Sequence, residues 1–345
     1  MLELGPCKVN KKASDTFINP YSWTSNATVI FLDQPIGTGF SYGNLRVKSS
    51  AEAAEGVYQF LRLLFEYFPQ YKDLDFHVFG ESYAGHYIPE IAKVLTSHPQ
   101  KVNLKSIGIG NGLVDMLIQS EYYADMAADP KYGPILTKKE IAKMKRNFPK
   151  CKRLIEKCYA KNNRKDCVKA GHYCDDINFD AFLDYDISFY DIRKKFDYYD
   201  VHDLRIQVYL NRKDVQAKLG VHRFFEGCND DVFDRFDHYG DGTRPVMGDF
   251  APLLNKGIKV LIYAGDADWI CNWIGNKKWV LELDWYGKKE FKRAIDEPWF
   301  GSNGKQAGEI RTFSNLTFVR VFKAGHFVPF DQPENSLEML NKWIH

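Results

Sequence analysis

Apolar positions recur with two different periods along the chain, and each period predicts a different kind of element. Over residues 50–68 they recur every three or four positions, as on the buried face of a helix. Ser49 and Ser50 are both suited to cap the start of this helix. The same period predicts a closing amphipathic helix over residues 336–344.

Short continuous apolar runs, bounded by turn-forming residues, are typical of buried strands. Such runs occur at residues 27–32, 76–79, 104–110, 258–264 and 316–322. Helical patterns lie between several of them, and this alternation predicts an α/β fold built on a central sheet. Residues 1–20 are expected to be irregular, because they are rich in Lys, Asn and Pro.

The alternation is interrupted in the middle of the chain. Residues 116–245 are charged, rich in Tyr and Asp, and helical in pattern, most clearly from Lys138 onward and over residues 201–219. We therefore expect one core domain in two parts, residues 1–115 and 246–345. A mostly helical cap, residues 116–245, is inserted between the two parts.

Composition and charge narrow the range of partners. The chain has 345 residues, 45% of them apolar, and a formal net charge of +2. This is enough apolar material for a large core, and so small a charge gives no bias toward nucleic acid or anionic membranes. No apolar run approaches the ~18 residues of a membrane-spanning helix. We expect a monomer with neither nucleic-acid nor membrane partners.

Candidate chemistry appears where the second apolar run ends. Residues 80–85 read Gly-Glu-Ser-Tyr-Ala-Gly and lead from a strand pattern into a helix pattern. This is the layout of a nucleophile elbow, which would expose the hydroxyl of Ser82 at a sharp turn. Small neighbours suit a strained serine backbone. Taken alone, the stretch is equally compatible with an ordinary loop.

Two later strands end in residues that could serve such a serine. Asp266 and Asp268 follow the fourth run, and His326 follows the fifth. A serine nucleophile needs a base, and the base needs an acid to hold its tautomer. The order Ser, Asp, His, each just after a strand, is that of α/β-hydrolases. Each residue singly is compatible with a turn, but together they favour a catalytic triad.

These motifs resemble the serine carboxypeptidase family. The likeness is carried by the elbow at residues 80–85, by Asn111-Gly112-Leu113, and by the short segments that end in Asp268 and His326. Further segments resemble the family's fungal vacuolar branch, carboxypeptidase Y, in particular. They are residues 20–23, 31–35, 270–273 and 329–335. The likeness spans residues 3–345 and is weakest over 114–250.

The resemblance implies an α/β-hydrolase fold with a mixed central sheet and a cap over the active site. It also implies a serine-type carboxypeptidase that releases C-terminal amino acids from peptides at acidic pH through an acyl-enzyme. No cofactor or metal is expected. By the same resemblance the triad acid is Asp268, while Asp266 caps the turn.

The resemblance further assigns residues to substrate binding. Glu81 and Glu3 would hold the C-terminal carboxylate of the peptide, with one of them protonated. The side-chain subsites would be lined by Tyr83, Leu113, Tyr190, Ile270, Cys271 and Phe327. A pocket tryptophan of the family falls at Gly242, which implies a wider pocket. For each pocket position, the alternative to substrate binding is ordinary packing. For Glu81 the alternative is an acid that is favoured at the start of a helix by the helix dipole.

Family members carry a segment before the position of Glu3 that has no counterpart in this sequence. It holds the first strands of the sheet and an Asn-Gly-Gly-Pro-Gly loop that supplies one oxyanion donor, the other being the N–H of Tyr83. A truncated member with little or no activity is therefore an alternative interpretation, and a related acyltransferase on the same scaffold is another. A non-enzymatic binding protein is disfavoured because all three triad positions are filled.

Four of the seven cysteines are grouped with spacings of 7, 9 and 7 residues. Four cysteines allow three disulfide connectivities, and the sequence alone does not choose among them. The resemblance favours the nested pairs, Cys151 with Cys174 and Cys158 with Cys167. A zinc site is the alternative, disfavoured because no C-x-x-C pair is present.

The cysteines and sequons bear on the compartment. Disulfides indicate an oxidising environment, and Asn26 and Asn315 begin glycosylation sequons. With the resemblance, this predicts a vacuolar or secreted glycoprotein. Residues 1–6 are unlike a signal peptide, so that taken literally the product would stay in the cytosol. Cys7 and Cys228 either pair with each other or stay reduced.

Overall fold

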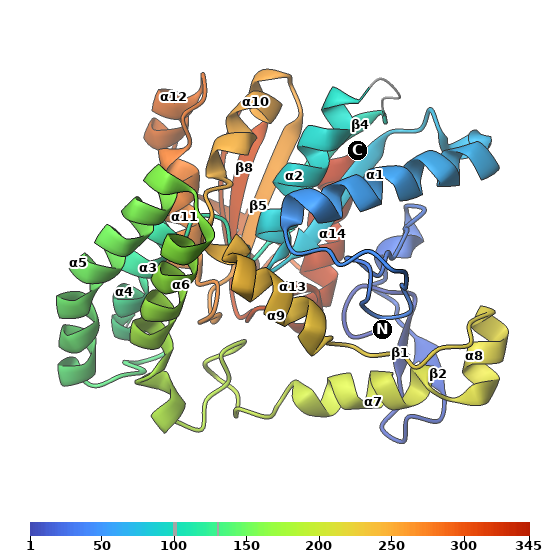
Figure 1. Ribbon diagram of the computed structural model, residues 1–345, viewed down its shortest axis with the longest axis horizontal. Coiled ribbons are helices and arrows are strands. Elements are labelled where there is room, and N and C mark those ends of the chain that lie inside the picture. The colour runs from blue at the N-terminus through green and yellow to red at the C-terminus, as the bar shows by residue number, and fades with distance from the viewer. Residues whose placement is uncertain (99–101, 130) are drawn as a thin grey trace.

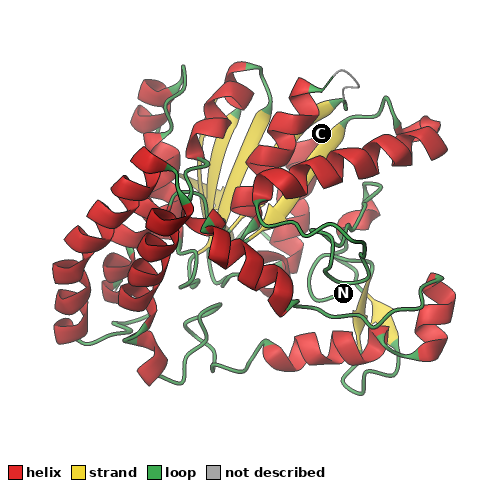
Figure 2. Ribbon diagram, viewed as in Figure 1, coloured by secondary structure: helices red, strands yellow, loops and turns green. Residues whose placement is uncertain are grey.

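The computed structural model describes residues 1–98, 102–129 and 131–345. Its centre is a six-stranded sheet in the order β3-β4-β5-β8-β7-β6 (Figures 1 and 2). Strands β3, β4, β5 and β8 run parallel, whereas β7 and β6 are antiparallel to their neighbours, so the sheet is mixed as predicted. The strands are β3 Phe76–Glu81, β4 Leu104–Gly110, β5 Lys259–Gly265, β6 Glu297–Phe300, β7 Gln306–Phe313 and β8 Leu316–Val321.

Strand β5 shows how the sheet builds two hydrophobic layers. Successive side chains of a strand point to opposite faces. Val260 and Ile262 therefore join a cluster with residues of α2, α10 and α11, whereas Leu261 and Tyr263 join a second cluster with residues of α14. The core helices are α1 Ser50–Tyr67, α2 Ala84–Ser97, α10 Phe250–Asn255, α11 Trp273–Glu282, α12 Lys288–Arg293, α13 Val328–Asp331 and α14 Pro333–Ile344.

Helix α1 confirms the first periodic prediction. Its N-cap is Ser49, whose hydroxyl accepts a hydrogen bond from the N–H of Glu52. Its apolar face, which includes Ala54 and Leu61, packs with α2 in one cluster. None of the helices in the described ranges combines the length and apolarity that crossing a bilayer requires.

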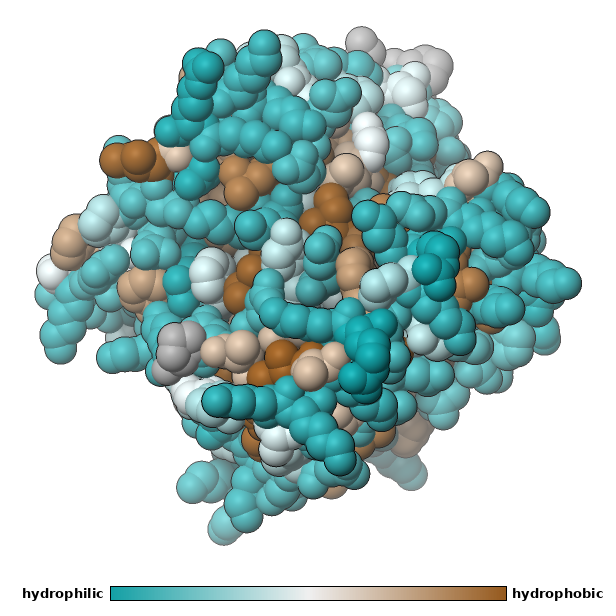
Figure 3. Space-filling view, turned by 90° about the vertical axis from the view of Figure 1, so that its left-hand side faces the viewer, coloured by the Kyte–Doolittle hydropathy of each residue, from teal (hydrophilic) through white to brown (hydrophobic). Residues whose placement is uncertain are grey.

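All helices of the middle segment lie between β4 and β5 in the chain. They are α3 Met116–Glu121, α4 Tyr123–Ala128, α5 Lys138–Lys161, α6 Arg164–Phe179, α7 Asp200–Leu210, α8 Lys213–Leu219 and α9 Asp230–Tyr239. Helix α5 begins with a capping box between Thr137 and Glu140, and it ends at Asn162, whose φ of 45° turns the chain back into α6. The face seen in Figure 3, on the side of α4, α5 and α12, is largely hydrophilic, as the charged helix patterns indicate.

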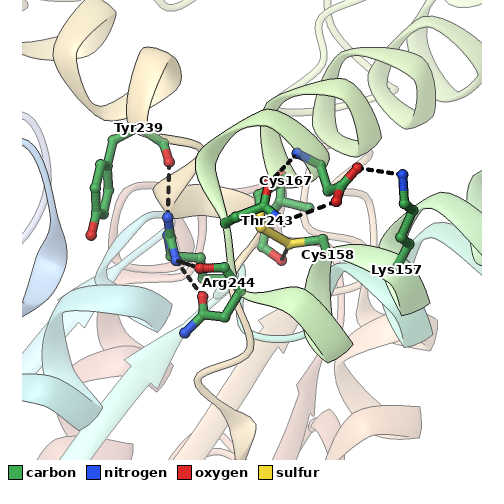
Figure 4. Close-up of a disulfide and its surroundings, with 9 residues drawn as sticks. Lys157, Cys158, Cys167, Tyr239, Thr243 and Arg244 are labelled. Carbon is green, nitrogen blue, oxygen red and sulfur yellow. Dashed lines mark hydrogen bonds and ion pairs between the residues drawn. A yellow bond between two sulfur atoms is a disulfide. The ribbon is translucent and has the colours of Figure 1, made fainter.

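Two disulfides join α5 to α6 side by side. Cys151 pairs with Cys174, and Cys158 pairs with Cys167, so the nested connectivity is confirmed. All four sulfur-bearing side chains are fully buried. Figure 4 shows the inner disulfide beside Arg244, which donates to the carbonyl of Tyr239. The cap hairpin is thus covalently fixed where it meets the segment that returns to the core.

The predictions for residues 1–32 are wrong in two places, and one hairpin of the sheet is missing from the predicted strands. No strand forms over residues 27–32, where Ile30 and Phe31 are exposed. A β-prone run needs a neighbouring strand to accept its backbone hydrogen bonds, and this run has none among the described residues. Residues 1–20 are not wholly irregular, since β1 Cys7–Val9 and β2 Thr16–Ile18 pair as an antiparallel ribbon. The hairpin of β6 and β7 was not anticipated either.

Candidate active site

Ser82 lies at a sharp turn between β3 and α2. Its φ is +61°, in the left-handed region that non-glycine residues seldom adopt, as a nucleophile elbow requires. A Cβ at Gly85 would lie 2.2 Å from the carbonyl oxygen of Leu113, and a Cβ at Gly80 would lie 2.6 Å from the Cβ of Ala84. The elbow therefore needs glycine at 85 rather than at 84, which explains the shifted motif.

The acid and the base meet beyond β5 and β8. Nδ1 of His326 lies 2.9 Å from Oδ2 of Asp268, and both side chains are buried. The same carboxylate oxygen accepts a hydrogen bond from the side-chain amide of Asn111 at 2.7 Å and from the N–H of Cys271 at 3.2 Å. Three donors thus hold Asp268 in one orientation toward the imidazole.

Asp266 is equally buried but serves another purpose. It accepts hydrogen bonds from the hydroxyl of Tyr132 at 2.7 Å and the N–H of Lys323 at 2.9 Å, and it forms an ion pair with Lys131. None of these partners is His326. Asp266 therefore ties the turn after β5 to the turn after β8, and the imidazole is paired with Asp268.

Four successive strands deliver one polar residue each to the same edge of the sheet. In the sheet order, Ser82 follows β3, Asn111 follows β4, Asp268 follows β5 and His326 follows β8. Ser82 and His326 share no direct side-chain hydrogen bond within the described residues. Such bonds are often long in the absence of substrate.

Asn111 is a residue whose role the sequence motif did not indicate. It is fully buried with φ +42°, its side chain accepts from the N–H of Gly265 at 3.1 Å, and it donates to Asp268. Its position in the sequence could have indicated this role. Asn111 is the first residue after β4, and β4 lies between β3, which precedes Ser82, and β5, which precedes Asp268.

A pair of carboxyl groups lies beside the serine. Glu81 and Glu3 share a hydrogen bond. Burial raises the pKa of Glu3 to about 7. Burial and the neighbouring Glu3 carboxyl group raise the pKa of Glu81 well above its usual range. Asn19 holds the Glu3 loop in place by donating to the carbonyls of Glu3 and Gly5 at 3.0 and 2.9 Å.

The predicted pocket residues fall into two groups around the serine. Tyr83 and Leu113 lie against Gly242, where an added Cβ would stand 3.4 Å from the Tyr83 ring and 3.8 Å from a Leu113 methyl group. Glycine at 242 therefore leaves space beside both side chains. Ile270 and Cys271 lie in the turn directly after Asp268, and Cys271 is a buried free thiol.

The second group lies around the imidazole. The ring of Tyr190, from the cap, is 5.2 Å from the rings of both His326 and Phe327. The carbonyl of Tyr190 also accepts the N–H of His326 at 2.6 Å. A possible metal-ligand grouping exists here, since Asp268, Cys271 and His326 have ligand atoms within 4.8 Å of one another. Two of these residues, His326 and Asp268, are hydrogen-bonded to each other, which is typical of an acid–base pair rather than of metal ligands.

The family model described as serine carboxypeptidase matches residues 1–345. The chain belongs to the serine carboxypeptidase family.

Curated relatives from fungi support the assignment. The vacuolar serine-type carboxypeptidase ATG42 of Saccharomyces cerevisiae is 43% identical, and the match covers 100% of this chain and 70% of the relative. Carboxypeptidase Y of Schizosaccharomyces pombe is 44% identical, covering 99% of this chain and 36% of the relative. For carboxypeptidase Y of Komagataella phaffii the identity is 43%, and the match covers 99% of this chain and 66% of the relative. The chain thus spans only part of the length of each of these three relatives.

A solved structure confirms the fold. Kex1Δp, a prohormone-processing carboxypeptidase from Saccharomyces cerevisiae, aligns with a TM-score of 0.86 at 23% identity, covering 100% of this chain and 79% of that one. At this identity the likeness concerns the fold alone. The serine carboxypeptidase chain therefore has an α/β-hydrolase fold with a mixed sheet, as expected.

Proposed function

We propose that this protein is a serine-type carboxypeptidase that removes C-terminal amino acids from peptides at acidic pH, with Ser82, Asp268 and His326 as its triad. The observation that carries the proposal is the joint arrangement of a strained serine, a bonded acid–imidazole pair and two neighbouring carboxyl groups with raised pKa values at one sheet edge. The first two supply acyl transfer, and the third supplies recognition of a free C-terminus.

In this mechanism Ser82 attacks the carbonyl of the last peptide bond. His326 accepts the serine proton and delivers it to the leaving amine, while Asp268 keeps the imidazole oriented through Nδ1. The acyl-enzyme is then hydrolysed by water, with His326 again moving the proton. The N–H of Tyr83 is placed to donate to the oxyanion, because N–H groups at the start of a helix have no partner one turn earlier.

The carboxyl pair accounts for exopeptidase action. A protonated Glu81 donates a hydrogen bond to the carboxylate of the substrate, whereas two ionised groups would repel it. As the pH rises through about 7, Glu3 loses its proton and adds a negative charge beside the carboxylate of the substrate. Binding of peptides with a free C-terminus should therefore be strongest under acidic conditions.

The substrate subsites and the compartment follow from the same assignment. We assign Tyr83, Leu113, Ile270 and Cys271 to the side-chain pocket beside Ser82. Tyr190 and Phe327 are assigned to the leaving-residue side. The relative named as vacuolar and the two disulfides support a vacuolar or secretory location. We expect the working form to be a monomer.

The test combines turnover with active-site labelling. The protein should release the C-terminal residue from an N-blocked dipeptide, and a sulfonyl fluoride should label Ser82. The variant S82A should lose both, with kcat falling by roughly four to six orders of magnitude. Labelling of S82A at the same site would contradict the assignment of the nucleophile.

A further inference from the structure

One segment of the cap contacts both catalytic turns. Residues 188–194, the bridging segment, lie in the chain between α6 and α7 (Figure 1). The carbonyl of Phe189 accepts the N–H of Trp269 at 3.1 Å, just after the triad acid, and the N–H of Ile192 donates to the carbonyl of Ala267 at 2.9 Å. The bridging segment thus holds the acid turn from both sides through backbone groups.

The bridging segment also touches the histidine turn. The carbonyl of Tyr190 accepts the N–H of His326, and a Cβ at Gly325 would lie 2.4 Å from that carbonyl oxygen and 2.7 Å from Cβ of Asp191. Only glycine allows so close an approach. The backbone before His326 is therefore packed directly against the cap.

An ion pair closes this contact. Arg193 donates to both carboxylate oxygens of Asp191, at 2.8 and 2.6 Å, and reaches Oδ2 of Asp331 at 3.3 Å. The same oxygen of Asp331 accepts the N–H of Gly325 at 2.7 Å. Asp331 is the last residue of α13 in the core, so Arg193 links the cap to the backbone immediately before His326.

The charges around Asp331 make Arg193 necessary. The charge of Asp331 interacts unfavourably with Asp191, and it also acts on Glu3 and Glu81. The balancing cations are Arg193 and Lys194, both from the bridging segment. Burial already raises the pKa of Asp331 to about 6, and loss of Arg193 would raise it further. A neutral acid accepts the Gly325 N–H more weakly than a carboxylate does.

We propose that Arg193 and Asp331 are positioning residues for His326. Through their ion pair, the cap fixes the Gly325 backbone and thereby the orientation of the imidazole relative to Ser82 and Asp268. The proposal rests on the proposed function, because it assigns His326 the role of the base. Neither residue touches the reacting atoms.

The first test replaces Arg193 and measures turnover per active site. R193M should lower kcat by about 10–100-fold on the blocked dipeptide, since small misplacements of a reacting group cost that much, while KM stays nearly constant. R193K should recover part of the loss, because lysine supplies the charge but not the planar fork. Counting sites by titration with sulfonyl fluoride removes any effect of misfolded protein.

The second test separates hydrogen bonding from charge at Asp331. D331N retains an oxygen for the Gly325 N–H and should lose less kcat than D331A. In R193M/D331N the losses should be less than additive, because both changes break one interaction. Full additivity would show that the two residues act independently and would overturn the proposal.

Arg311 provides a matched control. It forms a comparable, mostly buried ion pair with Asp296 at 2.8 Å on the side of β7, away from both catalytic turns. R311M should lower the melting temperature but leave kcat per titrated site unchanged. Wild-type kcat per site in R193M, or an equal fall in R311M, would also overturn the proposal.

Failure of the positioning role of Arg193 can be distinguished from failure of the proposed carboxypeptidase function. A protein that is labelled at Ser82 but releases no C-terminal residue is not a carboxypeptidase, yet its labelling rate still depends on His326. In that case R193M should slow labelling by a similar factor, and an unchanged rate would refute the positioning role. Absence of labelling in the unaltered protein would refute both.

Discussion

The carboxyl edge of the sheet and the helical cap hold their residues in place by different means. At the sheet edge, backbone geometry and buried hydrogen bonds place Ser82, Asn111, Asp268 and His326 at the ends of neighbouring strands. In the cap, two disulfides join α5 to α6, and polar contacts attach the bridging segment to the core. We therefore propose that the sheet edge carries the chemistry, whereas the cap adjusts the surroundings of groups that the core supplies.

The sharpest test of this division compares two buried acids that lie two positions apart in the chain but have different partners. D268N should lower kcat by about four orders of magnitude, because the imidazole loses the partner that sets its tautomer. D266N should change kcat per titrated site far less, since its partners are Lys131, Tyr132 and Lys323. Measured kcat for both variants checks the prediction, and the opposite order would reassign the triad acid.

The carboxyl pair is expected to give an intermediate effect that depends on pH. Glu81→Gln keeps a hydrogen-bond donor at every pH, so KM for peptides should lose its rise between acidic and neutral conditions. In the unaltered protein KM should increase as the pH passes about 7, where Glu3 loses its proton and the carboxyl pair becomes negatively charged. An unchanged KM–pH profile in the variant would remove Glu81 from carboxylate binding.

The raised pKa values also affect folding. The ordinary pKa of a glutamate is 4.5, whereas burial of its carboxyl group raises the pKa of Glu3 to about 7. Because the folded state holds the proton more tightly, the pair favours folding below pH 4.5, and this contribution is lost as the pH rises through 7. The electrostatics of the site thus suit an acidic compartment.

Changes confined to the cap should affect stability more than chemistry. Removing the inner disulfide with C158S/C167S should lower the free energy of unfolding by about 2–4 kcal/mol. Because the proposed catalytic groups lie outside residues 116–245, kcat per titrated site should change by less than about threefold. Denaturation and site-titrated turnover check both parts, and a large fall in kcat would show that the α5–α6 hairpin shapes the active site.

The smallest expected effect concerns glycosylation. Asn26 is exposed, whereas the side-chain amide of Asn315 donates to the carbonyls of Leu254 and Ile258 at 2.9 and 2.8 Å. A glycan at Asn315 would remove these bonds. In protein produced through a secretory route, we expect glycan at Asn26 and none at Asn315, as mass spectrometry of each peptide would show. The opposite pattern would contradict the local structure at Asn315.

The sequence predicts an element well where local interactions decide it and poorly where contacts with distant parts of the chain decide it. Strand β4 occupies residues 104–110 as predicted, and α1 agrees within one residue, because period and capping are local signals. Residues 27–32 have the local signal without a neighbouring strand, so the prediction of a strand there was wrong. Strand formation depends on long-range pairing that propensity does not contain.

The site divides in the same way. The triad could be proposed from strand ends and residue order alone, since the carboxyl ends of parallel strands share one edge. Family resemblance, not residue order, favoured Asp268 over Asp266. The pairing of Glu81 with Glu3 also rests on the resemblance, because 78 positions separate the two glutamates and no local pattern joins them. The contact between Arg193 and Asp331 joins cap to core across a still longer stretch, and no spacing rule indicates it.

The central claim is that acyl transfer and recognition of a free C-terminus occur at one site. It is tested most directly by comparing a peptide that has a free C-terminal carboxylate with the same peptide amidated, from pH 4 to 8. We predict release of single C-terminal residues from the free acid, with kcat/KM falling as the pH rises through about 7, and weaker, less pH-dependent cleavage of the amide. Equal cleavage of both peptides at every pH, or cleavage at internal bonds, would contradict the account.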